Sequence, residues 1–153
     1  MKNKIALDRQ QVYSLQKSFE QVLLIPETAA ALFYERLFEL EPSLRHMFKG
    51  DMDVQGRKLM SILKVAVASA GKLEQIAPAV SALGQRHAGY HVEEYQYDLV
   101  GGALLWTLEQ CLGEGFDPLT RQAWVDVYSI LANIMKDGMK EGAKTITLEK
   151  VVA

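Results

Sequence analysis

Apolar residues recur every three or four positions along most of the chain, the spacing that places them on one face of an α-helix. Strict alternation, which would indicate a half-buried strand, does not occur before the last residues. Asp8 precedes the first apolar stripe and has the side chain of a helix N-cap. That stripe consists of Val12, Leu15, Phe19, Val22 and Leu23. The pattern predicts an all-α protein.

Proline and glycine mark the expected helix ends. Pro26 can begin a second helix, which Glu41-Pro42 closes, and residues 42–48 follow as a short third helix. Further helices are expected at about residues 53–70, 75–90, 93–112 and 117–138. Such a set of long and short helices fits an up-and-down four-helix bundle poorly. We expect one domain over residues 1–138, then a polar and partly disordered tail over residues 139–153.

Composition and charge narrow the functional class. The 153 residues suit one domain, and the formal net charge of −2 gives no reason to expect binding to nucleic acid or to an anionic membrane. The first residues lack the apolar core of a signal peptide, and no apolar run approaches the ~20 residues of a membrane span. We therefore expect a cytoplasmic protein with no membrane or nucleic-acid partner. Cys111 stands alone, so no internal disulfide can form.

One histidine stands out because it shares a helix face with apolar residues. Val80, Leu83 and His87 are spaced i, i+3 and i+7, and so lie on the same side of the expected helix. Imidazole on an apolar face needs a partner, which can be a backbone carbonyl, a carboxylate or a metal ion. Most lone histidines in such a setting are hydrogen-bonded core residues, and this segment taken alone favours that interpretation.

The segment around His87 resembles the proximal-histidine helix of haemoglobin-type globins, and other stretches resemble the same family in the same order. Residues 32–42 are similar to the second helix of bacterial single-domain globins, flavohaemoglobin haem domains and neuroglobin. Residues 55–60 resemble the start of the distal helix, and residues 123–128 resemble part of the last long helix. The resemblance implies a globin fold, with about seven helices packed around haem b.

On the proximal side, the resemblance assigns His87 as the iron ligand and the carbonyl of Leu83 as the acceptor for its other ring nitrogen. His91 would bond a haem propionate, or else face solvent in a loop. Tyr97 matches a tyrosine that, in flavohaemoglobins, pairs with a glutamate of the last helix and increases electron donation from the histidine. The corresponding position here, eleven residues after Tyr128, is Met139. This departure puts peroxidase-like chemistry in doubt.

On the distal side, Tyr34 and Gln55 match the pair that holds bound oxygen in many bacterial globins. A phenol and an amide can both donate to the partial negative charge of bound O₂. Two ordinary alternatives compete with this assignment: Tyr34 as a core residue with its hydroxyl at the edge, and Gln55 as a surface residue at a helix start. Glutamine is a poor iron ligand beside imidazole, so the ferrous state is expected to be five-coordinate. The resemblance further implies that Leu59 shapes the pocket and that Phe48 packs flat on the haem. Lys58 or Arg57 could pair with a propionate, or else be solvated on an exposed helix. The expected apolar haem contacts are Val92, Val100 and Leu131.

These matches imply a globin that binds O₂ reversibly, and CO and NO as well. Three alternatives stay open: an NO dioxygenase that works with a separate reductase, the gas-sensing domain of a signalling protein, and a haem-free helical interaction domain. Whether the chain is an enzyme is therefore open. The chain contains no GxGxxG nucleotide-binding motif, so any reductase would be a partner protein. A monomer or a homodimer would be consistent with the sequence.

Overall fold

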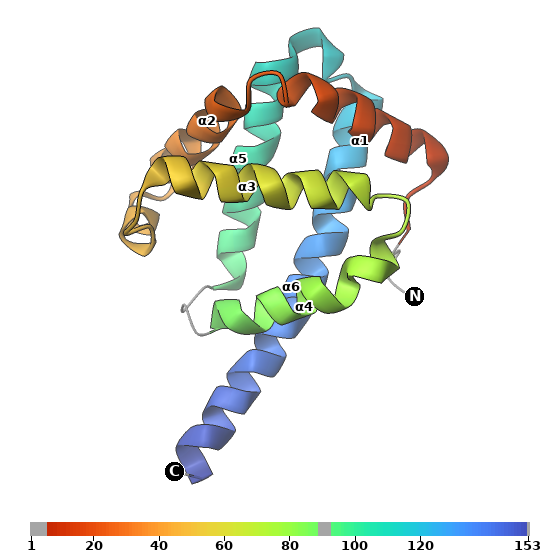
Figure 1. Ribbon diagram of the computed structural model, residues 1–153. Helices are drawn as coiled ribbons and strands as arrows, with labels where there is room; N and C mark the ends of the chain where they lie inside the picture. The colour runs from red at the N-terminus through yellow and green to blue at the C-terminus, as the bar shows by residue number, and fades with distance from the viewer. Residues whose placement is uncertain (1–5, 89–92, 153) are drawn as a thin grey trace.

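The computed structural model describes the backbone of residues 6–88 and 93–152, and the side chains of residues 6–87 and 93–142 (Figure 1). Over these ranges the chain is helical and contains no strand, which confirms the all-α prediction. The α-helices are α1 (Arg9–Val22), α2 (Pro26–Leu40), α3 (Met52–Ala68), α4 (Leu73–Ala88), α5 (Glu94–Leu112) and α6 (Pro118–Val152). Two short 3₁₀ segments, η1 (Pro42–Met47) and η2 (Gly113–Gly115), lie between α2 and α3 and between α5 and α6.

Local capping explains where the helices begin. Asp8 accepts a hydrogen bond of 2.8 Å from the backbone N–H of Gln11, whose side chain returns a bond to the Asp8 N–H. Pro26 stands in the first turn of α2, where no N–H is needed. Asp117 precedes α6 and accepts from the N–H of Thr120 at 2.8 Å. Each of these starts was predicted from the sequence.

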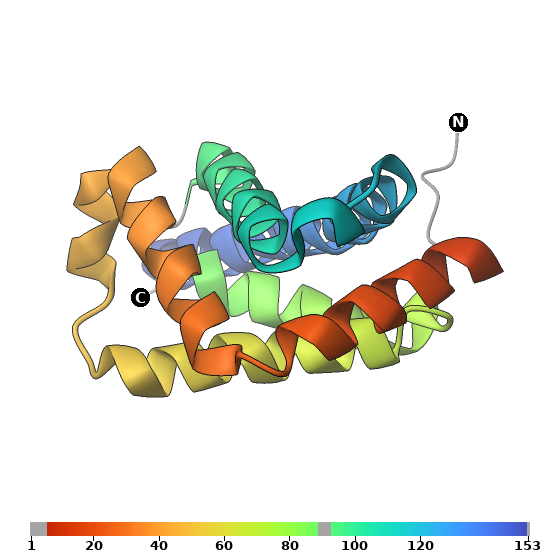
Figure 2. The ribbon, with the colours of Figure 1, turned by 90° about the horizontal axis from the view of Figure 1, so that it is seen from above.

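The helices pack in pairs, and α3 and α4 pack against different helices. The principal contacts join α4 with α6, α2 with α5, α1 with α6 and α2 with α3. In Figure 1, α3 crosses in front of α5 and α6 and α4 crosses in front of α6, and Figure 2 shows α3 on the side of the molecule away from α5. Because α4 rests on α6 and α3 rests on α2, the arrangement does not require α3 and α4 to pack directly on each other.

The core lies where α1, α2, α5 and α6 meet. Trp124 is 1% exposed, and its indole N–H donates to the hydroxyl of Ser18 at 2.9 Å. This bond satisfies a polar group that would be costly to bury unpaired. Leu15, Leu37, Leu73 and Leu108 are the other large side chains that are almost completely buried. None of the helices in the described ranges is long and apolar enough to cross a membrane.

The expected end of the last helix near Gly138 is wrong, because α6 continues to Val152. A glycine usually ends a helix by adopting a conformation that other residues avoid. Gly138 and Gly142 instead lie inside α6, where a Cβ would collide with the backbone of Ser81 and of Gln85 in α4. These glycines allow close contact between two helices rather than ending one. The separation of residues 139–153 as a partly disordered tail stays a prediction.

Candidate functional site

His87 lies in the last turn of α4 with its side chain half-buried. Its Nδ1 is 2.7 Å from the carbonyl oxygen of Leu83, one turn earlier. Because a carbonyl oxygen can only accept, Nδ1 carries the proton, and the lone pair of the neutral ring is on Nε2. A second group that fixes the tautomer and orientation of the ring is typical of metal-binding histidines. The geometry of His87 therefore suits a metal ligand.

The helix that carries His87 is held very close to α6 by glycines. A Cβ on Gly84 would collide with the backbone of Met135, as one on Gly138 would with that of Ser81. Close backbone contact of this kind leaves little freedom for one helix to slide along the other. The glycine contacts therefore fix the turn of α4 that contains both Leu83 and His87.

Tyr97 is buried in the first turns of α5 and faces α6. Its hydroxyl oxygen is 3.9 Å from the sulfur of Met139, so α6 places beside Tyr97 the residue that stands where the resemblance implies a glutamate. A thioether is only a weak acceptor. Burial raises the pKa of the Tyr97 phenol, and the charge of Glu94 raises it further. Tyr97 is therefore a neutral phenol whose hydroxyl meets an uncharged sulfur.

Tyr128 of α6 contacts the same first turns of α5. Its hydroxyl donates to the carbonyl of Tyr97 at 2.5 Å, and its ring fills the space beside Gly101, where a Cβ would lie 2.7 Å from a ring carbon. Burial is the main cause that raises the pKa of the Tyr128 phenol. Tyr128 therefore stays protonated and continues to donate to the backbone of α5.

Tyr34 of α2, proposed from the resemblance as a distal residue, meets Gln55 of α3. The amide Nε2 of Gln55 donates to the hydroxyl oxygen of Tyr34 at 3.3 Å. Because Tyr34 accepts in this bond, its own O–H can donate to a third group. Burial raises the pKa of Tyr34 above its ordinary value of 10.0, and the bond from Gln55 lowers it by less. The pair therefore presents a neutral phenol whose proton is available to an acceptor.

Aromatic rings surround Tyr34 and limit its motion. The ring of Phe48 lies 5.4 Å from that of Tyr34 and 5.6 Å from that of Phe38, centre to centre, with edges turned toward faces. Phe33 makes a further edge contact with Tyr34 at 4.9 Å. Such contacts each stabilise an arrangement by about 0.5–1.5 kcal/mol beyond their buried area. The resemblance had singled out only Phe48 from this cluster.

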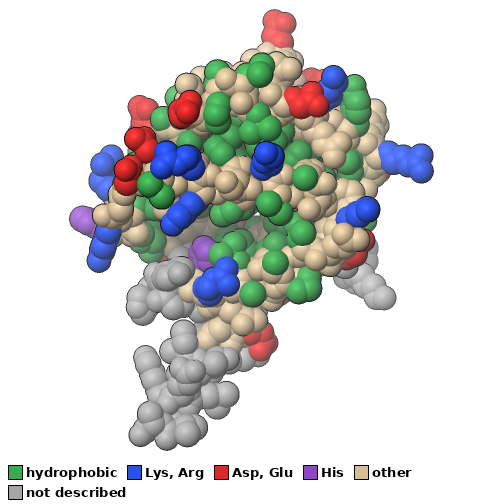
Figure 3. All heavy atoms as spheres, in the orientation of Figure 1, with side chains coloured by type: hydrophobic (Ala, Val, Ile, Leu, Met, Phe, Trp, Pro, Cys, Tyr) green, Lys and Arg blue, Asp and Glu red, His purple; other side chains and the backbone are tan. Residues whose placement is uncertain are grey.

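The remaining predicted residues differ in their surroundings. Leu59, Val100 and Leu131 are half-buried and pack against the core, whereas Lys58 is exposed. His91 and Val92 lie outside the described residues. The surface is hollowed between α3 and α4, and a histidine side chain lies at the edge of the hollow (Figure 3). The oriented imidazole of His87 fits the iron-binding histidine that the resemblance implies.

Sequence reasoning missed two features that position the site. Phe38 stands four residues after Tyr34, a spacing that brings two side chains together on a helix and could have indicated the ring contact. The role of Gly84 and Gly138 was also missed. The four-residue spacing of Gly138 and Gly142 was the available signal, since it places two residues without side chains on one face of a helix.

Comparison with known proteins agrees with this architecture. The globin family model matches residues 31–135. A flavohemoprotein of Vibrio cholerae is 29% identical over 114 residues, which are 72% of this chain and 28% of the relative. The chain therefore spans less than a third of that protein's length.

Two solved structures share the fold. An engineered carbene transferase, made from a candidate nitric oxide dioxygenase of Rhodothermus marinus, superposes with a TM-score of 0.82 at 22% identity and covers 93% of this chain and 99% of its own. A hexacoordinated haem protein from an anhydrobiotic tardigrade gives a TM-score of 0.79 at 14% identity, over 92% of this chain and 99% of its own. At such identities the likeness concerns the fold alone. The match of the family model over most of the chain shows that this protein belongs to the globin family.

Proposed function

We propose that this globin holds haem b through Nε2 of His87 and binds O₂ reversibly, with CO and NO as further ligands. Membership of the globin family supports a haem cofactor. The observation that carries the proposal is the contact between His87 Nδ1 and the Leu83 carbonyl, which leaves Nε2 as the nitrogen with a lone pair. Haem would supply an iron atom with one open position for a diatomic gas.

The chain's own residues would then act on both sides of that group. Leu83 holds the ring of His87 in one orientation, and the α4–α6 glycine contacts hold the helix. On the opposite side, the phenol of Tyr34 would donate its proton to a gas that carries partial negative charge. Gln55 supports this donation indirectly, because its amide donates to the Tyr34 oxygen and so directs the phenol proton away from itself. Leu59 and Phe48 would exclude water from the same space.

The direct test is reconstitution of the purified protein with haem, followed by its ferrous spectrum without added ligand. A five-coordinate haem gives one broad visible band, and a six-coordinate low-spin haem gives a split pair. We expect the single band, because Gln55 stands where a coordinating histidine would close the sixth position. A split pair at neutral pH would contradict the open site, and failure to take up haem would contradict the whole proposal.

A second candidate function is NO dioxygenation, which the similarity to a flavohemoprotein favours. In that reaction bound O₂ oxidises NO to nitrate, and a separate reductase, also proposed here as the partner, returns the iron to its ferrous form. Mixing the oxygenated protein with NO and measuring nitrate and ferric haem tests the chemical step. Sustained turnover only with an added flavin reductase would favour the enzyme, whereas slow oxidation without turnover would favour the carrier.

A further inference from the structure

The phenol ring of Tyr34 belongs to a triangle of three aromatic rings. Its centre lies 5.4 Å from that of Phe48 and 6.1 Å from that of Phe38, and the centres of Phe38 and Phe48 are 5.6 Å apart. Tyr34 is buried, whereas Phe38 and Phe48 are half-buried and lie toward the surface. The orientation of the Tyr34 ring therefore depends on where the two outer rings are held.

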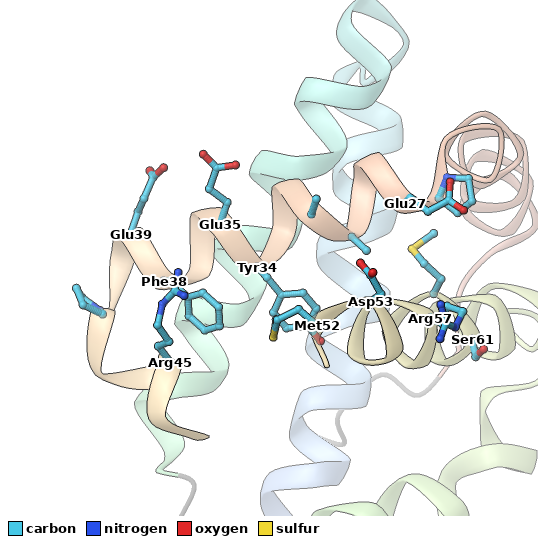
Figure 4. A pocket seen from close by; sticks show the side chains of 16 residues that line it. Glu27, Tyr34, Glu35, Phe38, Glu39, Arg45, Met52, Asp53, Arg57 and Ser61 are labelled. Atoms are coloured by element: carbon cyan, nitrogen blue, oxygen red, sulfur yellow. The ribbon is translucent and has the colours of Figure 1, made fainter. Parts of the chain in front are cut away.

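Arg45 of η1 contacts both of the outer phenylalanines. Its guanidinium carbon lies 4.9 Å from the centre of the Phe38 ring, within the range of about 6 Å for an attraction between a cation and an aromatic face. Its backbone carbonyl accepts a hydrogen bond of 3.1 Å from the N–H of Phe48. In Figure 4, Arg45 extends from η1 to the ring of Phe38, and Tyr34 follows along the same helix. One exposed residue thus contacts Phe38 through its side chain and Phe48 through its backbone.

A nearby carboxylate is already paired with another cation. Glu39 follows Phe38 in the sequence and lines the same groove between α2 and α3 as Arg45 does (Figure 4). Its carboxylate forms an ion pair of 3.3 Å with Arg36, one turn earlier on α2. Because this pair engages Glu39, the Arg45 guanidinium can remain over the Phe38 ring.

We propose that Arg45 is a positioning residue for the distal hydrogen bond. Acting through Phe38 and Phe48, it keeps the Tyr34 phenol in the orientation from which the hydroxyl donates to bound O₂. The inference rests on the proposed function. Bound CO carries less negative charge and gains less from a donor, so the effect of Arg45 falls on O₂ release and leaves CO release nearly unchanged. Arg45 therefore contributes to the discrimination between the two gases.

Three variants separate the contact with the ring from other effects. Arg45→Met removes the cation and keeps an unbranched side chain, and the backbone carbonyl that Phe48 uses is still present. Arg45→Lys keeps a cation that can lie over Phe38. Arg121 is exposed in the first turn of α6, so Arg121→Met loses the same charge elsewhere and is the control.

The measurement is stopped-flow release of O₂ and CO from the haem-loaded full chain. Arg45→Met should speed O₂ release by about two- to fivefold, the range that an exposed contact between a cation and a ring allows. CO release should stay unchanged, and Arg121→Met should alter neither gas. Arg45→Lys should lie closer to the wild type than Arg45→Met does. Unchanged O₂ release, equal acceleration of both gases, or a lysine variant as fast as the methionine variant would overturn the proposal.

A purely structural role for Arg45 would persist without the phenol hydroxyl, whereas a positioning role would not. In a Tyr34→Phe background, Arg45→Met should therefore cause no further change in O₂ release. A further acceleration in that background would overturn the proposal.

Infrared spectra of the CO complex give a readout that involves no ligand release. The C–O stretching band responds to the groups that face bound CO, so a phenol held in one orientation should give one band. Arg45→Met should add a second band, from molecules in which the phenol has turned away, and Tyr34→Phe should abolish this splitting. A single unshifted band in Arg45→Met would contradict the positioning role alone, whereas a protein that takes up no haem would contradict the proposed function.

Discussion

The hydroxyl of Tyr97 lies 3.9 Å from the sulfur of Met139, and both side chains are more than nine-tenths buried. This contact joins the start of α5 to the part of α6 that extends past the expected helix end. Lys136 lies on the same side, with its ammonium 5.8 Å from the centre of the Tyr97 ring. The phenol hydroxyl therefore faces a neutral sulfur acceptor, and the ring has a cation beside it.

The uncharged acceptor beside the Tyr97 hydroxyl predicts that His87 donates electrons only weakly to the haem iron. A carboxylate at residue 139 would accept a charge-assisted hydrogen bond from Tyr97, about twice as strong as a neutral one. Met139→Glu should therefore raise the iron–histidine stretching frequency of the ferrous haem, measured by resonance Raman spectroscopy. Met139→Leu, which removes the sulfur without adding charge, is the control and should leave the frequency unchanged. An unchanged frequency in the glutamate variant would show that Tyr97 does not act on the histidine.

The ligand assignment predicts a specific rescue. His87→Gly should lose stable haem binding and regain a five-coordinate spectrum when free imidazole is added, because the small ligand can occupy the space of the missing ring. His46 is exposed in η1, so His46→Ala serves as the control and should keep the original spectrum. If His87→Gly keeps a normal five-coordinate spectrum without imidazole, another residue is the ligand.

At the α4–α6 contact, replacing a glycine by alanine should lower the free energy of unfolding, although alanine has the higher helix propensity. In a helix interior, Gly→Ala usually stabilises by about 0.5–1 kcal/mol. At Gly84 and Gly138 the added methyl group meets backbone atoms that cannot rotate away, and overpacking of this kind costs about 1–3 kcal/mol. We therefore expect Gly84→Ala and Gly138→Ala to lower the free energy of unfolding, by up to about 2 kcal/mol.

The matched control is Gly102 in α5, which is exposed and where an added methyl group would meet no atom of another helix within 4 Å. Gly102→Ala should raise the free energy of unfolding, because only the gain in helix propensity applies there. Urea denaturation of the three variants measures both the expected decreases and the expected increase in the free energy of unfolding. Stabilisation at Gly84 or Gly138 would mean that the two helices are not in close contact.

Helix beginnings could be predicted from the sequence because their causes are local. Asp8 and Pro26 each act within one turn, and the chain shows them directly. The end of α6 could not be predicted, because Gly138 is kept helical by its contact with Ser81, a residue distant in the sequence. The pairing of Tyr34 with Gln55 came only from family resemblance, since no local rule joins residues 21 positions apart.

The distal phenol should stay a donor well into the alkaline range. Loss of its proton would remove the donated hydrogen bond, and burial raises the pKa of Tyr34 above 10.0, so that loss moves to higher pH. The O₂ dissociation rate should therefore be constant from about pH 6 to about pH 9, below the ordinary tyrosine value. Tyr34→Phe should show no rise at still higher pH. A rise near neutral pH that Tyr34→Phe abolishes would contradict the buried phenol.

How O₂ is held can be tested by a cycle of four proteins. A hydrogen bond to a charged group contributes about 1.5–3 kcal/mol, roughly ten- to two-hundredfold in an equilibrium constant. Because the bond forms only after the gas has bound, Tyr34→Phe should speed O₂ release by at least about tenfold. CO carries less negative charge when bound, so its release should change much less.

Gln55→Leu should act in the same direction but more weakly, because Gln55 donates to the Tyr34 oxygen and so supports the phenol. In the double variant the effects should not add, since Gln55 acts through the phenol that Tyr34→Phe removes. Stopped-flow release of O₂ and CO from the wild type, both single variants and the double variant measures the coupling. Equal acceleration for both gases would indicate a steric gate without hydrogen bonding. Unchanged O₂ release in Tyr34→Phe would mean that the phenol does not donate to bound O₂. Additive effects would mean that Gln55 acts independently of Tyr34.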